Sequence, residues 1–579
     1  MATAMKAEVR PLNPELKPAN PEESAPSLDA VLGGNPFVDF DLRQMAGTIG
    51  EFTLSLAARP DVLVSTLAAL GRELFKIGLG SSVLAPEPAD KRFIDPTWNE
   101  NPVYRHLLQA YLAWRNAMHD LVADGRSDGQ AWKLSAQHRF AVMQLTEALA
   151  PTNLLLSNPA ALKRAFETGG RSLVAGMLNL IDDLIHNGGM PSQVDKRPFE
   201  VGRNLAATPG AVVYRSELCE VIQFKSAAAQ VYERPVVLVP PQINKYYVMD
   251  LAPKRSLIEY GLARGIQFFA VSWRNPGVAQ RDWGLDDYVR AAGEAVDVAG
   301  KVAGSADVNL LGVCAGGITS SLLLGHLATA NEHKVNAATL LVTMLDSSHP
   351  SMAGMFATED AVCAALKRSH EKGVLDAASM SRLFAWLRPN DLVWHYWVNN
   401  YLMGKEPAAF DILFWNADST NLTAALHAGF LDLLMRNPLA EHQPVKILGT
   451  SIDLRQVACD MYIVAGLTDH ICSWRACHHA ARLFGGTTEF VLNSSGHVQT
   501  LVCPPDNPKA KYFTNPRLGD DPAAWLREAQ EHKGSWWENW LTWLERRSGE
   551  KRAAPESLGS GEFPILTSAP GTYVHQRPS

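Results

Sequence analysis

Short apolar runs alternate with helical segments through the C-terminal two thirds of the chain. Six runs after about residue 200 have the length and composition of buried strands. They are RPVVLVPP, GIQFFAVSW, VNLLGVC, AATLLVTMLD, DMYIVAG and TEFVLN. Their alternation with helical segments predicts an α/β fold in which helices cover both faces of a mainly parallel sheet. We assign residues 201–579 to this domain.

The N-terminal part of the chain has a different pattern. From about residue 40 to 190 the apolar positions follow helical spacing, which predicts a mainly helical domain over residues 36–200. One helical face in this region carries Leu107, Tyr111, Trp114, Met118 and Leu121. Residues 1–35 are rich in Pro, Ala, Glu and Ser, so we expect them to form a disordered tail.

Two aromatic-rich segments modify the α/β pattern. Residues 347–450 interrupt the strand and helix alternation, and we expect them to form a cap over the carboxyl edge of the sheet, where such folds bind ligands. The cap aromatics are Trp386, Trp394, Tyr396, Trp397, Phe410, Phe414 and Trp415. A final helix places Trp536, Trp540, Trp543 and Leu544 on one face, which indicates core or interface packing.

The run VNLLGVC ends in a cysteine between small residues, and a helix follows at once. The sequence Gly312-Val313-Cys314-Ala315-Gly316 resembles the nucleophile elbow of α/β-hydrolases, in which small neighbours permit a strained turn that presents the nucleophile. We therefore predict Cys314 as a catalytic nucleophile and an α/β-hydrolase fold with an inserted cap.

Two later strands end in residues that suit a thiol nucleophile. Asp469 follows the strand DMYIVAG and His497 follows the strand TEFVLN, which gives the chain order nucleophile, acid, base of α/β-hydrolases. His497 would accept the thiol proton or form an ion pair with the thiolate, and Asp469 would orient the imidazole. Asp346 also ends a strand and is the alternative acid.

An oxyanion formed at Cys314 requires backbone donors. In this fold they come from the residue after the nucleophile, here Ala315, and from a loop after an earlier strand, for which we select Ile243 in VPPQINKYY. A cysteine also suits transfer of activated acyl groups, because an acyl-cysteine is still a thioester. A serine ester would lie lower in energy.

Composition narrows the classes of function. The chain has 579 residues, a net charge of −7 and no long basic run, which disfavours nucleic-acid binding. We find no leader-like start and no apolar segment of membrane-spanning length, so we expect a cytoplasmic protein. Seven irregularly spaced cysteines indicate reduced thiols rather than a disulfide framework.

We interpret several other histidines and cysteines as structural residues rather than catalytic or metal-binding ones. WRACHHAARLF has the pattern of an ordinary helix and lacks paired ligand spacing, so we expect no metal site. The residues concerned are Cys472, Cys477, His478 and His479. His470 is interpreted as a structural neighbour of Asp469, and His326 needs no catalytic role.

Several longer motifs carry a family resemblance. GVCAGG, PPQINKYYVMDL, VSWRNP, FDILFWNADSTNL, AGLTDHI and SSGHVQ together resemble the poly(3-hydroxyalkanoate) synthases over nearly the full chain. TEALAPTN, FETGGRSLVAG, HNGGMPSQV and the terminal GTYVH are similar to the class II enzymes, which act as a single type of subunit on medium-chain substrates.

The resemblance implies a reaction and residue roles. The substrate would be (R)-3-hydroxyacyl-CoA, the product a polyester with CoA released, and no cofactor would be needed. Cys314 matches the acylated nucleophile, His497 the general base, and Asp469 the acid proposed to help activate the 3-hydroxyl of the incoming unit. Thr343 and Gln499 align with positions that shape the acyl pocket, and a threonine in place of the serine common in pseudomonads would favour shorter units.

The resemblance also implies partners and location. It predicts a homodimer at the surface of polyester granules in the cytoplasm, alongside granule-associated proteins, with the N-terminal region aiding dimerisation and targeting and a mobile cap gating the site. Two other functions stay open: an acyl-CoA thioesterase or esterase on the same fold, and a noncatalytic granule-coat protein.

Overall fold

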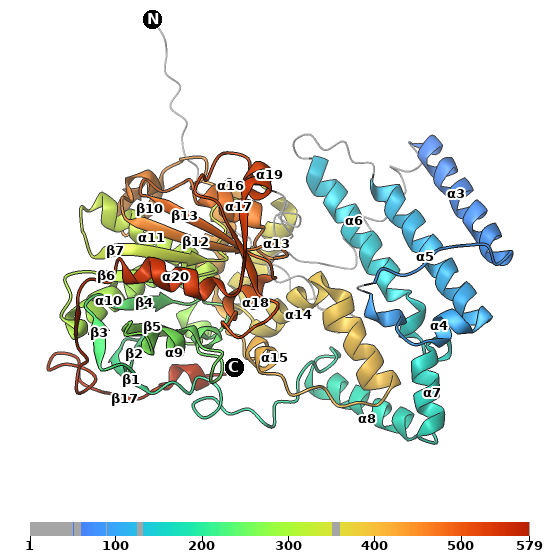
Figure 1. Ribbon diagram of the computed structural model, residues 1–579, viewed down its shortest axis with the longest axis horizontal. Helices are drawn as coiled ribbons and strands as arrows, with labels where there is room; N and C mark the ends of the chain where they lie inside the picture. Colours follow the sequence, from blue (N-terminus) through green and yellow to red (C-terminus); the bar gives the residue numbers. More distant parts are fainter. Residues whose placement is uncertain (1–49, 51–58, 89, 124–130, 350–358, 578–579) are drawn as a thin grey trace, which may run out of the picture.

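The computed structural model describes residues 50, 59–88, 90–123, 131–349 and 359–577. The expected disordered tail, residues 1–35, lies outside this part of the chain. Figure 1 shows an α/β body beside a helical lobe, which is coloured blue to cyan. The lobe contains α3 (Pro60–Gly78), α4 (Thr97–Glu100), α5 (Pro102–Ala123), α6 (Ala131–Ala148), α7 (Pro159–Glu167) and α8 (Arg171–His186). The prediction of a helical N-terminal region is thus confirmed.

Helix α5 is amphipathic, but its buried stripe is centred one position later than the sequence pattern indicated. Leu108, Tyr111 and Leu112 are buried in a small core with Phe93 and Trp98. Leu107, which the sequence pattern predicts on the same face, is 37% exposed. The helix is oriented so that Leu108 and Leu112 are buried. These residues are four positions apart and so lie one above the other on the same face.

The α/β body is built on an eleven-stranded sheet in the order β15-β14-β13-β12-β7-β6-β4-β5-β2-β1-β17. The six central strands are parallel and correspond to the six predicted runs: β4 (Val236–Val239), β5 (Phe268–Trp273), β6 (Val308–Val313), β7 (Val335–Leu341), β12 (Asp460–Gly466) and β13 (Thr488–Asn493). The α/β-hydrolase fold class is confirmed.

Antiparallel strands that the sequence analysis did not predict extend the sheet at both edges. They are β1 (Gly210–Arg215), β2 (Cys219–Phe224), β14 (Lys511–Thr514), β15 (Gln530–Lys533) and β17 (Thr567–Ser568). The pair β14 and β15 reads KYFT and QEHK, which contains no apolar run. Short two-stranded ladders join β3 (Gln230–Tyr232) to β16 (Lys551–Ala553) and β10 (Val445–Ile447) to β11 (Thr450–Ile452).

Helices cover both faces of the sheet. One core contains residues of α10 (Leu285–Ala303), α11 (Ala315–Thr329), α16 (Ala424–Arg436) and α17 (Trp474–Ala480), and α19 (Pro522–Glu528) contributes Trp525. The opposite core contains residues of α9 (Leu257–Leu262), α18 (His497–Leu501) and α20 (Trp536–Glu545). All four apolar positions predicted to share a face of the last helix are buried: Trp536, Trp540, Trp543 and Leu544. Core packing is therefore the correct interpretation.

The segment between β7 and β12 contacts both the α/β body and the helical lobe. It contains α13 (Glu359–Lys372), α14 (Ala377–Leu387), the π-helical segments η6 (Asn390–Trp394) and η7 (Trp397–Leu402), α15 (Asp411–Asn416) and α16, with β8 (Val374–Leu375) paired to β9 (Leu422–Thr423). Its middle part packs on the helical lobe, where the Trp397 indole donates to the Asn153 carbonyl at 3.0 Å and the Gln193 amide to the Leu392 carbonyl at 2.7 Å. The predicted cap therefore also contacts the N-terminal helices.

No described helix combines the length and the apolar character that a membrane crossing requires.

Candidate active site

Cys314 lies at the junction of β6 and α11 in a strained backbone conformation. Its φ of 51° and ψ of −119° are rarely adopted by a residue with a side chain, and such strain is typical of a nucleophile elbow. The neighbouring glycines make room for the turn. A Cβ at Gly316 would lie 2.3 Å from the Val239 carbonyl oxygen, and one at Gly312 would lie 2.6 Å from Ser320 Oγ.

The structure brings His497 and Asp469 together at the same edge of the sheet. Asp469 lies three residues beyond β12, and His497 is the first residue of α18 after β13. His497 Nδ1 is 2.7 Å from Asp469 Oδ2. The other carboxylate oxygen accepts hydrogen bonds from the backbone N–H groups of Ile471 at 2.8 Å and Cys472 at 2.9 Å.

Cys314 joins this pair through a hydrogen bond with the His497 side chain. A hydrogen bond from the Cys472 thiol, together with the charge of His497, holds the pKa of Cys314 well below its usual range despite burial. Burial disfavours the imidazolium, but the charges of Asp469 and Cys314 outweigh it and raise the pKa of His497 to about 10. Both shifts favour the imidazolium and the thiolate forms of the pair.

Cys472 is a member of this cluster that the sequence analysis did not select. It is buried, and its donor atom lies within 4.8 Å of those of Asp469 and His497. The hydrogen bond to the Cys314 thiolate, and then burial, raise the pKa of Cys472 well above its ordinary value, so it stays protonated and donates. Its place three residues after Asp469, on a turn capped by that carboxylate, was the available signal.

Asp346, the alternative acid, is held elsewhere. Its Oδ1 accepts hydrogen bonds from the Ser348 N–H and the Asn437 side-chain amide, both at 2.9 Å. Its Oδ2 faces His479 at 3.8 Å. Of the two candidate acids, the structure brings Asp469 to the imidazole of His497.

The two remaining histidines, His470 and His326, have different surroundings. Half-buried His470, next to Asp469, has its pKa lowered to about 4 by burial and then by Arg388, so it is neutral at physiological pH. His326 contacts the Thr450 hydroxyl at 2.8 Å.

Comparison with known proteins agrees with the fold and the motifs. Residues 89–261 match the N-terminal region of poly-beta-hydroxybutyrate polymerases, and residues 222–502 match the alpha/beta hydrolase fold. Poly(3-hydroxyalkanoate) polymerase 1 of Ectopseudomonas oleovorans is 47% identical over 96% of this chain and 99% of its own length. The chain belongs to the poly(3-hydroxyalkanoate) polymerase family.

Within the poly(3-hydroxyalkanoate) polymerases, similarity differs between relatives. A polymerase subunit of Cupriavidus necator is 38% identical over 84% of this chain and 83% of its own length, below the value for the Ectopseudomonas enzyme. The crystal structure of the Paleococcus ferrophilus monoacylglycerol lipase covers 57% of this chain and 100% of its own, at 14% identity and a TM-score of 0.33. Membership of the polymerase family supports polyester synthesis and an enzymatic function.

The predicted oxyanion donors of this polymerase lie beside the elbow. The Ala315 N–H hydrogen-bonds the Cys314 sulfur. Ile243 lies in the loop after β4, and the last residue of that strand, Val239, and the following Pro240 approach Gly316 closely. The Ile243 carbonyl accepts from the Thr420 N–H at 3.1 Å. The oxyanion role of both residues stays a prediction.

The two predicted pocket residues of the polymerase have different surroundings. Thr343 lies two residues beyond β7, rather than on the strand as expected, and it is buried against the elbow backbone. Its hydroxyl donates to the Leu341 carbonyl at 3.1 Å, and a Cβ at Gly317 would lie 1.9 Å from its Oγ1. Gln499 is exposed on α18. Their role in substrate choice stays a prediction.

We predict that Cys472→Ala raises the pKa of Cys314. Loss of a hydrogen bond to a charged group costs about 1.5–3 kcal/mol, equivalent to roughly one to two pKa units. The thiolate would then exist over a narrower pH range. As the pH is lowered, alkylation of Cys314 by iodoacetamide should therefore decline at a higher pH than in the unmodified enzyme. The measurement is the alkylation rate of the Cys314 peptide by mass spectrometry across pH.

Cys472→Ser is the matched control, because a hydroxyl still donates to the thiolate. Its alkylation profile should stay close to that of the unmodified polymerase. Superimposable profiles for Cys472→Ala and the unmodified enzyme would show that this thiol does not stabilise the Cys314 thiolate.

Proposed function

We propose that this chain polymerises (R)-3-hydroxyacyl-CoA into poly(3-hydroxyalkanoate) through an acyl-cysteine on Cys314, with release of CoA, as an acyltransferase. The observation that carries the proposal is the hydrogen-bonded chain of Cys314, His497 and Asp469 in a member of a polymerase family.

The first half-reaction transfers the acyl group to the enzyme. The Cys314 thiolate attacks the thioester carbonyl, and the Ala315 N–H, with Ile243 as second donor, stabilises the oxyanion. Collapse of the tetrahedral intermediate breaks the bond between the carbonyl carbon and the CoA sulfur. The departing CoA thiolate takes the proton of the His497 imidazolium, which leaves acyl-Cys314, CoA and a neutral imidazole.

The second half-reaction forms the ester. Neutral His497 removes the proton of a 3-hydroxyl, and the resulting alkoxide attacks a thioester carbonyl of acyl-Cys314. The ester bond forms as the bond to the Cys314 sulfur breaks, which restores the thiolate and imidazolium. Each cycle lengthens the chain by one ester and consumes no cofactor.

Burial of the site favours a hydroxyl acceptor over water. The His497 side chain is 9% exposed and that of Asp469 is 0% exposed. Low exposure of the base and the acid supports transfer to a bound hydroxyl over hydrolysis. Product analysis, described below, distinguishes the polymerase from the alternative thioesterase or esterase.

We propose that Asp469 acts through His497. Both carboxylate oxygens are occupied, one by His497 and the other by the N–H groups of Ile471 and Cys472. Direct activation of a substrate hydroxyl, the role implied by the family resemblance, would require one of these hydrogen bonds to break.

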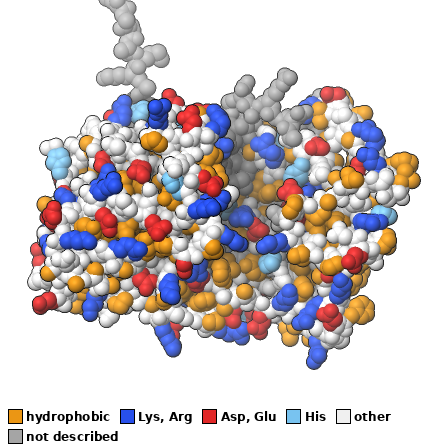
Figure 2. Space-filling model, viewed as in Figure 1, with side chains coloured by type: hydrophobic (Ala, Val, Ile, Leu, Met, Phe, Trp, Pro, Cys, Tyr) orange, Lys and Arg blue, Asp and Glu red, His pale blue; other side chains and the backbone are white. Residues whose placement is uncertain are grey.

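The helical lobe presents an apolar face that supports the proposed location at the granule surface. Figure 2 shows hydrophobic side chains on the outside of this lobe. Helix α8 exposes Val174, Met177, Leu178, Ile181, Leu184 and Ile185. Contiguous exposed apolar side chains mark interaction surfaces, and an aliphatic polyester is a suitable partner. Homodimer formation and contacts with granule-associated proteins are further proposals that rest on the family resemblance.

We predict that Cys314→Ala abolishes both CoA release and polymer formation. The purified chain would be incubated with 3-hydroxyacyl-CoA of graded length while free CoA and insoluble polyester are followed together. The loss should be roughly a thousandfold or more, as for removal of other nucleophiles. Cys314→Ser should retain at most a small residual rate, because the alkoxide forms far less readily than the thiolate.

Cys363→Ala is the matched control for this test, because Cys363 is exposed on α13. It should leave both rates unchanged. CoA release accompanied by free hydroxy acid and no polymer would support hydrolysis instead. Unchanged polymer formation by Cys314→Ala would support the noncatalytic granule-coat function.

We predict that Asp469→Asn lowers turnover about 10⁴-fold by selecting the wrong imidazole tautomer. The asparagine amide would donate to Nδ1, so Nε2 would carry the proton and could not accept one from Cys314. The Cys314 thiolate and the first burst of CoA should both be lost. Retention of the burst with loss of elongation alone would show that Asp469 acts on the substrate hydroxyl.

We predict that Thr343→Ser shifts the substrate range towards longer acyl units. Serine keeps the hydroxyl and removes one methyl group, and a single such group changes selectivity about tenfold. The measurement is the ratio of turnover for C8 and C4 substrates. Thr343→Val keeps the side-chain shape and serves as control, and an unchanged ratio in Thr343→Ser would exclude this role.

A further inference from the structure

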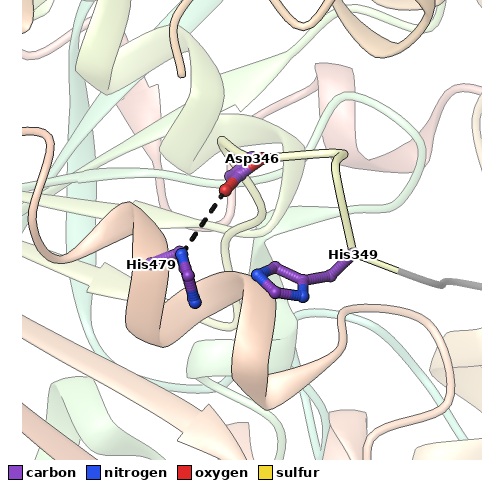
Figure 3. A group of neighbouring side chains, drawn as sticks. All are labelled: Asp346, His349 and His479. Atoms are coloured by element: carbon purple, nitrogen blue, oxygen red, sulfur yellow. Dashed lines mark ion pairs between the residues drawn. The ribbon is translucent and has the colours of Figure 1, made fainter. Parts of the chain in front are cut away.

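A second group of metal-compatible side chains lies outside the Cys314, His497 and Asp469 cluster. Asp346 and His349 come from the segment that leaves β7, and His479 comes from α17. Donor atoms of the three residues all lie within 4.8 Å of one another. Figure 3 shows the His349 and His479 rings side by side, with the Asp346 carboxylate facing His479.

The spacing of the donors suits a shared cation better than direct contacts. Asp346 Oδ2 and His479 Nδ1 are 3.8 Å apart, which is too long for a hydrogen bond. Two ligands bound tetrahedrally to zinc at about 2.0–2.1 Å would lie roughly 3.4 Å apart, so a small inward movement completes the geometry. The imidazole centroids are 4.1 Å apart at an angle of 58°, so the rings are tilted rather than stacked.

The surroundings orient the ligands and leave donor capacity unused. Asp346 is buried, and hydrogen bonds from Ser348 and Asn437 fix its Oδ1 while Oδ2 faces His479. Such support of a carboxylate is typical of metal sites. Among the described residues, His349 Nε2 is a buried nitrogen without a hydrogen-bond partner.

The chemistry of the three side chains agrees with a metal-binding role, and no hydrogen bond or ion pair with another cation occupies the Asp346 oxygen that faces His479 among the described residues. The nearby cation Arg482 is paired with Asp520 at 2.6 Å. Two imidazoles and one carboxylate form a donor set that favours zinc, cobalt or nickel.

We propose that Asp346, His349 and His479 bind a divalent cation of the zinc type, with water completing the coordination. The cation would tie the start of the insertion between β7 and β12 to α17, the helix that follows the Asp469 turn. It would thereby stabilise this edge of the sheet without taking part in acyl transfer.

Cobalt(II) binding to the full-length, chelator-treated chain tests the proposal. Binding at this site should give visible d–d absorption without a sulfur-to-cobalt charge-transfer band, because all three ligands offer nitrogen or oxygen. His349→Ala and His479→Ala should each weaken cobalt binding at least about tenfold. His333→Ala, which removes an exposed histidine elsewhere, should leave it unchanged.

The active-site group of Asp469, Cys472 and His497 is the competing cobalt site. A sulfur charge-transfer band that disappears in Cys472→Ser would place the metal there and overturn the proposal. Unchanged affinity in both His349→Ala and His479→Ala would overturn it too. Asp346→Asn keeps the oxygen that accepts from Ser348 and Asn437, so the metal-free Tm of this variant should stay near that of the unmodified chain. Because the carboxylate ligand is removed, the thermal stabilisation by zinc should be lost.

Discussion

The interaction between the Cys314 sulfur and the His497 imidazole is the one on which this site depends. Burial alone would raise the pKa of a thiol, so the thiolate requires compensating charge and donors. They reach it from three strand ends: the Ala315 N–H after β6, the Cys472 thiol after β12 and His497 after β13. Parallel order places these ends on one edge, and Asp469 balances the positive imidazole with a hydrogen bond of 2.7 Å.

The same edge has to hold a strained elbow. The Cys314 backbone costs on the order of 1–3 kcal/mol, which the packing of β6 and α11 in the two sheet cores offsets. Hydrogen bonds from the Cys314 N–H to Leu341 at 2.9 Å and from Val342 to Val464 at 2.7 Å continue the sheet beyond the ends of its strands. The elbow is therefore fixed by its neighbours, and its orientation depends on the register of β7 and β12.

The sequence predicts those features of this structure that depend on neighbouring residues, and misses those that depend on contacts between residues far apart in the chain. The central strands and the residues at their ends are local signals, so the sequence alone indicates Cys314, Asp469 and His497. The role of Cys472 depends on a thiol 158 positions away in the chain, and its place on the turn after Asp469 indicates proximity to the acid but not that contact. The pairing of Asp346 with His479 is long-range in the same way, and the polar edge strands β14 and β15 are defined by pairing rather than by an apolar run.

The insertion between β7 and β12 holds the loop that would supply Ile243 as an oxyanion donor. The Thr420 N–H donates to the Ile243 carbonyl at 3.1 Å, and the Trp415 indole donates to the Lys245 carbonyl at 2.8 Å. Buried Lys245 in turn pairs with Asp418 at 2.7 Å. Breaking a buried ion pair is costly, so residues 415–420 resist displacement from the loop after β4. Residues 415–420 therefore anchor the insertion against the loop after β4.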